Sequence, residues 1–149
     1  MKPDLFVTHD PTEHAEIEVE LIGSYENVVC AGDGHPLADS RPTAPDAFTS
    51  ARFIGPAEGD RADGWPPDVA RQVRVVTDDP HAEAHACRRD QLLAVLPVPF
   101  VADDPAPEMV SWQPGFLSPT RLYAVRRRQI VDDDLLAGLI ARLTTLLDR

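Results

Sequence analysis

The sequence has little lysine, little cysteine and no long hydrophobic run. Lys2 is the only lysine, and arginine supplies the remaining basic side chains. The two cysteines, Cys30 and Cys87, each lie in an apolar stretch, which predicts buried free thiols rather than a disulfide. The longest nearly pure apolar run, residues 92–102, contains two prolines and is far shorter than the roughly 20 residues of a membrane helix. The sequence opens without the apolar segment of a signal peptide, so we expect a cytoplasmic chain that makes no membrane contact.

Positive charge is also in short supply. There are 14 Lys and Arg residues against 25 Asp and Glu residues, which gives a formal net charge of −11. Binding to a phosphate backbone needs a positively charged surface, so the composition argues against direct nucleic-acid binding by this chain. Hydrophobic residues make up 43% of the chain, which excludes wholesale disorder, and 149 residues are enough for one domain.

Short apolar segments separated by turn residues predict strands along most of the chain. The clearest is residues 15–21, in which apolar side chains alternate with Glu16, Glu18 and Glu20. This period of two predicts a half-buried strand whose solvent face is acidic. The chain is expected to turn at residues 23–24. Further strands are predicted at residues 4–8, 25–31, 52–55, 73–77, 92–96, 109–112 and 121–126.

Helices are predicted at residues 65–72, 80–89 and 132–148, with a single helical turn at 46–48. The last helix has the strongest pattern, because leucine and isoleucine recur in it at spacings of three and four residues. Residues 32–38 and 56–64 are expected to be loops. Strands that alternate with helices in this way indicate an α/β fold.

Six segments, read in order, resemble the effector-binding domain of LysR-type transcriptional regulators. Each match is short, but their order and spacing extend over nearly the whole chain. The matching segments are the strand at 4–8, the VVCA strand and GHPLA loop at 28–31 and 34–38, the APDAF segment at 44–48 with Phe53 and Ile54, the strand at 73–77, the AVLP segment at 94–97, and the LYAVRR strand at 122–127 with the helix that follows it.

Two departures from the family pattern stand out. The family commonly has a glycine turn before its Leu-Pro strand, whereas residues 88–92 contain no glycine. The larger departure concerns the winged helix-turn-helix and the first half of the first subdomain, which precede the strand at 4–8 in the family and have no counterpart here. Strand edges and a helix face that this half would cover are left open, so we expect the chain to form an oligomer or to pair with another chain.

The resemblance implies a periplasmic-binding-protein-like (type 2) fold, with a mixed sheet flanked by helices and an amphipathic C-terminal helix. It implies one partial effector-binding domain over residues 1–149. About 10–118 would form the second subdomain, and 1–9 with 119–149 would belong to the first. The implied function is ligand sensing in transcription regulation: the chain binds a small effector, with an anionic effector as one option, self-associates, and performs no chemistry.

The family binds its ligand between the two subdomains, near the strands that cross from one to the other. Positions at the end of the strand at 4–8 and in the loop after 52–55 correspond to this place. Backbone N–H groups of such a loop can face a carboxylate, and an arginine can offer a guanidinium fork to an anion. The competing interpretation is an ordinary solvent-exposed loop. The implied ligand-binding residues are Thr8, His9, Gly55, Pro56, Ala57, Glu58 and Arg61.

No catalytic group, cofactor or metal site is predicted. His81 and His85 would share one helical face at a spacing that suits a metal ion, but Glu83 would point off that face. An exposed helix with two histidines is the commoner arrangement. Neither cysteine has a neighbouring histidine, so a catalytic thiol is unsupported.

Two other functions stay open at this stage. One is a free-standing accessory protein or small enzyme of a biosynthetic pathway, in which His9, Glu58 or the histidines of residues 80–89 act as acid–base groups. The other is an interaction protein that titrates an intact regulator chain through its exposed strand edges and helix face.

Overall fold

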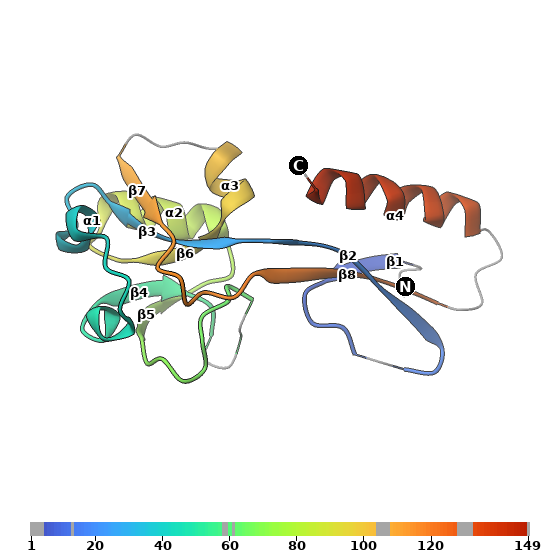
Figure 1. The fold of residues 1–149 in the computed structure, drawn as a ribbon, viewed down its shortest axis with the longest axis horizontal. Coiled ribbons are helices and arrows are strands. Elements are labelled where there is room, and N and C mark those ends of the chain that lie inside the picture. The colour runs from blue at the N-terminus through green and yellow to red at the C-terminus, as the bar shows by residue number, and fades with distance from the viewer. Residues whose placement is uncertain are drawn as a thin grey trace. The chain divides into compact units, whose positions relative to one another are not determined.

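The computed structural model describes residues 5–12, 14–57, 60, 62–103, 108–127 and 133–148, without the side chains of residues 133 and 136. The chain divides into two compact units (Figure 1). Unit 1 consists of Met1–Tyr25 with Thr120–Arg149, and unit 2 consists of Glu26–Pro119. The assignment of these units to the two subdomains of the resembled family stays a prediction.

Unit 1 is a three-stranded antiparallel sheet with one helix. The strands β1 (Leu5–Thr8), β8 (Thr120–Arg127) and β2 (Ile17–Tyr25) lie in that order, with β8 in the centre. The helix α4 (Asp133–Leu147), red in Figure 1, lies along one face of this sheet. Its buried residue Ile140 forms a small core with Ile22 and Ala124.

A bulge in β2 brings α4 close to the sheet. The register of β2 against β8 shifts between Leu21 and Gly23, and this irregularity places Ile22 in the core under α4. A Cβ atom on Gly23 would lie only 2.7 Å from the Cβ of Leu147. Glycine is therefore required at this position for the last turn of α4 to contact the strand.

The acidic row of β2 lies on the same face of the sheet as α4. Glu18 pairs with Arg126 and Glu20 with Ala124, and residues opposite each other on neighbouring strands share a face. Both glutamates remain exposed, as the alternation predicts. The apolar row continues on the other face, where Leu21 is 55% exposed and Phe6 is 48% exposed. Among the described residues, unit 1 therefore leaves part of an apolar sheet face open.

The described residues of unit 2 form five strands in two groups. An antiparallel sheet has the order β6 (Ala94–Pro97), β3 (Asn27–Gly32) and β7 (Met109–Trp112). A parallel pair is formed by β4 (Arg52–Gly55) and β5 (Gln72–Val76). The two groups are connected by an isolated parallel bridge between Phe53 and Leu93. The backbone of Leu93 also donates a hydrogen bond to the carbonyl of Arg52 and accepts one from the N–H of Ile54.

Four helical segments surround these strands: α1 (Pro36–Ser40), the 3₁₀ turn η1 (Pro45–Phe48), α2 (Pro80–Arg89) and α3 (Val98–Asp103). All four carry proline in the first turn, where a missing N–H group costs no hydrogen bond. Side chains of β3 alternate between two buried clusters. Val29 contributes to an aromatic cluster on one face, and Cys30 contacts α2 on the other. The rings of this aromatic cluster are Phe48, Phe53, Trp65, Trp112 and Phe116.

Most of the predicted elements are confirmed, with four corrections. Residues 23–24 continue β2 instead of turning the chain, and the loop predicted at 32–38 contains the start of α1. The predicted helix at 65–72 is wrong, because this segment is a series of turns that ends in β5. The helix α3 was not predicted. Cys30 and Cys87 are buried free thiols, as the sequence predicts. Among the described residues, no helix combines the length and apolar character that crossing a membrane requires.

Candidate functional site

A pocket of about 630 Å³ lies in unit 2 beside the end of β4. Two of the residues expected to bind ligand, Pro56 and Ala57, form part of its wall. The opposite wall comes from the turns before β5 and from β5 itself. Its charged lining residues are Asp60, Arg71 and Arg74. The pocket volume is within the range of small-molecule sites, and of the three charged side chains that line it among the described residues, two are cationic.

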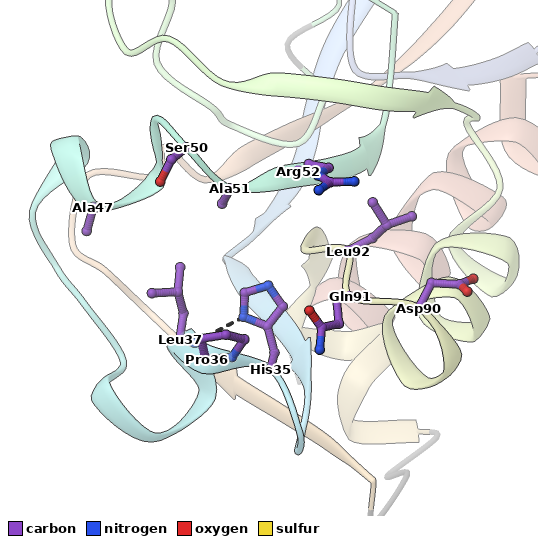
Figure 2. A pocket seen from close by; sticks show the side chains of 10 residues that line it. All are labelled: His35, Pro36, Leu37, Ala47, Ser50, Ala51, Arg52, Asp90, Gln91 and Leu92. Carbon is purple, nitrogen blue, oxygen red and sulfur yellow. Dashed lines mark hydrogen bonds between the residues drawn. The ribbon is translucent and has the colours of Figure 1, made fainter.

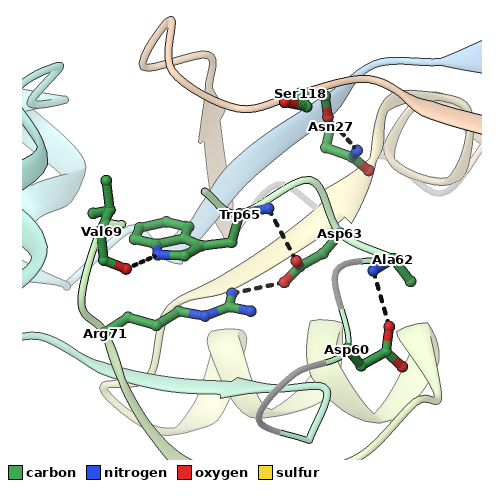
Figure 3. Close-up of polar contacts among 8 residues, drawn as sticks. All are labelled: Asn27, Asp60, Ala62, Asp63, Trp65, Val69, Arg71 and Ser118. Carbon is green, nitrogen blue, oxygen red and sulfur yellow. Dashed lines mark hydrogen bonds and ion pairs between the residues drawn. The ribbon is translucent and has the colours of Figure 1, made fainter. Parts of the chain in front are cut away.

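Arg71, which lines this pocket, is held by an ion pair with Asp63 and a ring contact with Trp65 (Figure 3). Its guanidinium donates from Nη1 to Oδ2 of Asp63 at 2.6 Å and lies 4.9 Å from the ring centroid of Trp65. The side chain is only 7% exposed. A planar guanidinium carries five N–H donors, and one bond to Asp63 leaves others at the pocket wall. The chain therefore presents a pre-positioned cationic donor to anything that enters.

The local sequence explains why Arg71 and Asp63 meet. Asp63 accepts a hydrogen bond from the backbone N–H of Trp65, and the indole Nε1 donates to the carbonyl of Val69 at 2.8 Å. These bonds close the segment into tight turns, which return Arg71 to Asp63 over eight residues. Gly64 has a φ of +76°, and a Cβ atom there would lie 2.0 Å from the carbonyl oxygen of Ser118. The turn therefore needs glycine for both its φ angle and its close backbone approach.

Glu83 of α2 is a buried carboxyl group near this ion pair. The residue is 7% exposed, and burial raises the pKa of its carboxyl to about 8. This value includes the effect of nearby charges: Asp63, Asp79 and Asp78 raise the pKa, and Arg71 lowers it. Glu83 is consequently mostly neutral at pH 7, and the local charge is left to Asp63 and Arg71.

The residues expected to bind ligand fall into three groups. Gly55 and Pro56 are buried at the end of β4, and Ala57 is exposed beside them. Thr8, half-buried, ends β1 in unit 1, and the exposed His9 follows it. Because these two residues belong to the other unit, their part in the site stays a prediction. The remaining two, Glu58 and Arg61, lie outside the described residues.

The residue that most clearly shapes the pocket, Arg71, is not among those that the sequence indicated as ligand-binding. Arg71 was expected on a helix over 65–72, where it would have no reason to meet Asp63. The sequence feature that could have indicated turns is the pair of prolines, Pro66 and Pro67, which fit turns as well as they fit the first turn of a helix.

The two cysteine thiols are unreactive, because burial raises the pKa of the Cys87 thiol to about 12 and also raises that of Cys30.

The two histidines of α2 do not converge with other ligands. Both are exposed, and the ring of His81 contacts the edge of Phe100 at a centroid distance of 5.0 Å. Within the described ranges, no group of three or more His, Cys, Asp and Glu side chains is placed to hold a metal ion.

Comparisons with known proteins give a consistent fold. The family model described as LysR substrate binding domain matches residues 2–148. The regulatory domain of NMB2055 (MetR), a LysR family regulator from N. meningitidis, is 18% identical with a TM-score of 0.68, covering 95% of this chain and 68% of that chain. The Synechocystis PCC6803 CcmR regulatory domain in complex with 2-PG is 17% identical with a TM-score of 0.74, covering 98% and 74%. A variant of the OxyR2 regulatory domain from Vibrio vulnificus is 14% identical with a TM-score of 0.76, covering 97% and 73%. A comparison with curated proteins gives no significant match.

Proposed function

This chain belongs to the LysR substrate-binding domain family, the regulatory effector-binding domains of LysR-family regulators, and on that premise we propose that it senses a small anionic effector and self-associates. The fold is the periplasmic-binding-protein-like (type 2) α/β fold of that family. In the proposed function the chain acts in the cytoplasm, performs no chemistry and makes no direct contact with nucleic acid. Its net charge of −11 supports the last point.

The observation that carries the effector proposal is Arg71 in the pocket beside Pro56 and Ala57. A largely buried guanidinium that still borders a cavity favours a carboxylate or phosphate, because both accept two parallel hydrogen bonds from the fork. Arg74 adds a second positive charge, and its Nη2 contacts the amide oxygen of Gln72 at 3.1 Å. A related regulatory domain was solved with the small molecule 2-PG, which agrees with a small-molecule role.

The proposed mechanism is a shift between conformations that exist without ligand. An effector changes their balance only by binding one of them more tightly. The turns over 63–71 are the responsive element, since they position both Trp65 in the core and Arg71 in the pocket. Contacts of an effector with Arg71 would therefore change the packing of Trp65 in the core of unit 2.

Small carboxylates and phosphate esters are expected to raise the melting temperature of the wild-type chain. A ligand at 100 times its Kd adds about 2.7 kcal/mol to the free energy of unfolding, or roughly 5–10 °C for a domain of this size. Thermal denaturation against a panel of anions measures this. Arg71→Lys keeps the charge beside Asp63 but removes the fork, so it should abolish most of the shift, and Arg74→Gln should reduce it.

Arg89→Gln is the matched control, because Arg89 is an exposed arginine outside this pocket. Its response to ligand should equal that of the wild type. A panel without any stabilising anion, or an undiminished shift in Arg71→Lys, would show that this pocket is not the effector site.

The proposed self-association rests on apolar surface in unit 1. Exposed leucines of α4, Leu135 at 73%, Leu139 at 43% and Leu146 at 60%, lie within one stripe, since their spacings of four and seven residues return to the same side of a helix. The stripe is on a different side of α4 from Ile140, which faces the sheet. A second copy of the chain can cover it by packing the two helices against each other.

Sedimentation velocity is expected to show a dimer of the wild-type chain at micromolar concentration. The double variant Leu139→Glu/Leu146→Glu places charges on the stripe and should shift the chain to monomer without unfolding it. Leu21→Glu, on the open sheet face, is the matched control and should stay dimeric. A compact wild-type monomer, or dissociation by Leu21→Glu alone, contradicts an interface through α4.

A further inference from the structure

Unit 2 contains a second pocket that the proposed effector site does not use (Figure 2). It has a volume of about 500 Å³ and lies at the start of β4, whereas the effector pocket lies beyond its end. Three segments that are distant in the sequence form its walls: His35–Leu37 at the start of α1, 47–52 from η1 to β4, and 90–92 after α2. Four residues of strand, about 13 Å, separate the two pockets.

His35 contributes a hydrogen-bond donor whose direction is fixed. Its Nδ1 accepts the backbone N–H of Leu37 at 3.0 Å and thereby caps α1. In neutral histidine this leaves the proton on Nε2. Burial lowers the pKa of His35, so the neutral form prevails at pH 7. In Figure 2 the second ring nitrogen points away from Leu37 into the open space that Arg52 and Gln91 border.

Arg52 supplies the positive charge of this pocket. The side chain is exposed and lines the cavity, and within the described part of the chain it has no hydrogen bond or ion pair. Asp90, the acidic residue of the lining, directs its carboxylate away from Arg52 in Figure 2. The hydroxyl of Ser50 and the amide of Gln91 add further donors at the rim. The polar groups of this pocket thus favour an anion.

The rest of the lining is apolar. Leu37, Ala47 and Leu92 are half-buried and face the cavity beside the donors. Apolar walls with a few directed polar groups are typical of sites that bind small organic molecules. A ligand here needs an anionic head of the size of a carboxylate and an apolar body of a few carbon atoms.

We propose that this pocket is a second ligand site, which binds a small monocarboxylate with an apolar tail. The carboxylate accepts hydrogen bonds from the guanidinium of Arg52 and from Nε2 of His35. The tail lies against Leu37 and Ala47. Because the ligand contacts α1, the start of β4 and the turn before β6, it connects three segments that are distant in the sequence.

The test uses 3-phenylpropanoate as the probe and 3-phenylpropanamide as its uncharged isostere. Titrations followed by backbone amide NMR spectra should show saturable shifts at His35–Leu37, Ser50–Arg52 and Gln91–Leu92 with the acid and none with the amide. Arg52→Gln should weaken binding at least tenfold. His35→Asn preserves an oxygen that can cap α1 but removes the Nε2 donor, and it should weaken binding severalfold.

Two variants serve as controls. Asp90→Asn should bind at least as tightly as the wild type, and Arg71→Lys, which alters the effector pocket, should leave these shifts unchanged. The proposal is overturned if neither 3-phenylpropanoate nor hexanoate gives saturable shifts at these positions up to about 10 mM, the weak end of specific binding. It is equally overturned if Arg52→Gln binds like the wild type, or if the shifts occur only around Ala57 and Arg71.

Discussion

Replacing Trp65 with alanine is expected to lower the free energy of unfolding by about 3–5 kcal/mol. The residue is 1% exposed and belongs to the aromatic cluster of unit 2. Its ring meets Phe53 and Phe116 edge-on, with centroids 5.1 and 5.3 Å away. Alanine would leave a cavity among these rings and remove the surface on which Arg71 lies. Urea denaturation followed by far-UV circular dichroism measures the loss.

Two further variants separate the causes. Trp65→Phe keeps most of the volume but removes the hydrogen bond from Nε1 to Val69, so it should cost about 1–2 kcal/mol. Leu135→Ala truncates a side chain that is 73% exposed and should change stability by less than about 0.5 kcal/mol. If Trp65→Ala were as mild as Leu135→Ala, the aromatic cluster would not be the main core of unit 2.

Glu83→Gln is expected to stabilise the chain at alkaline pH and to leave it unchanged at pH 4. The folded chain holds the Glu83 proton up to a pKa of about 8, whereas the unfolded chain releases it above its ordinary pKa of 4.5. Between these values the folded state binds more protons, so its stability falls as the pH rises and levels off above pH 8. Glutamine imitates the protonated carboxyl and escapes this loss, a gain on the order of 5 kcal/mol at pH 8.5.

Melting curves of both proteins from pH 4 to pH 9 measure this difference. Glu26→Gln, which changes an exposed carboxyl group, should follow the wild-type curve throughout. Equal pH profiles for Glu83→Gln and the wild type would mean that Glu83 ionises normally in the folded chain. A destabilised Glu83→Gln at every pH would mean that a charged Glu83 forms a favourable contact.

Local patterns predicted the elements well where one segment decides its own structure. The alternation in 15–21 predicts a strand with exposed glutamates, and the structure confirms it. The helix predicted at 80–89 is confirmed as α2, whose N-cap Asp79 accepts a hydrogen bond from the backbone of His81. Which face of β2 receives α4 depends on a bulge at Ile22, and strand patterns alone do not encode it.

Predictions failed where tertiary contacts decide the backbone. The turns over 65–71 form because the Trp65 indole can reach both the aromatic cluster and the carbonyl of Val69. The helix α3 was not predicted because Pro97 and Pro99 suggested a break in regular structure, although proline is compatible with a first helical turn. For the site, the family resemblance indicated the loop at Pro56 and Ala57. It could not indicate Arg71, whose role arises from its distant partner Asp63.

The contacts of α4 with the sheet of unit 1 lie in its carboxyl half, at Ile140, Leu143 and Leu147. The helix has 15 residues and a length of about 22 Å. A tilt of about 5° at the bulge of β2 would carry the opposite end of the helix through roughly 2 Å. That end bears Leu135, the most exposed of the leucines in the stripe. The amino-terminal turns of α4, which carry this leucine, are thus the part of the helix with the fewest core contacts among its described side chains.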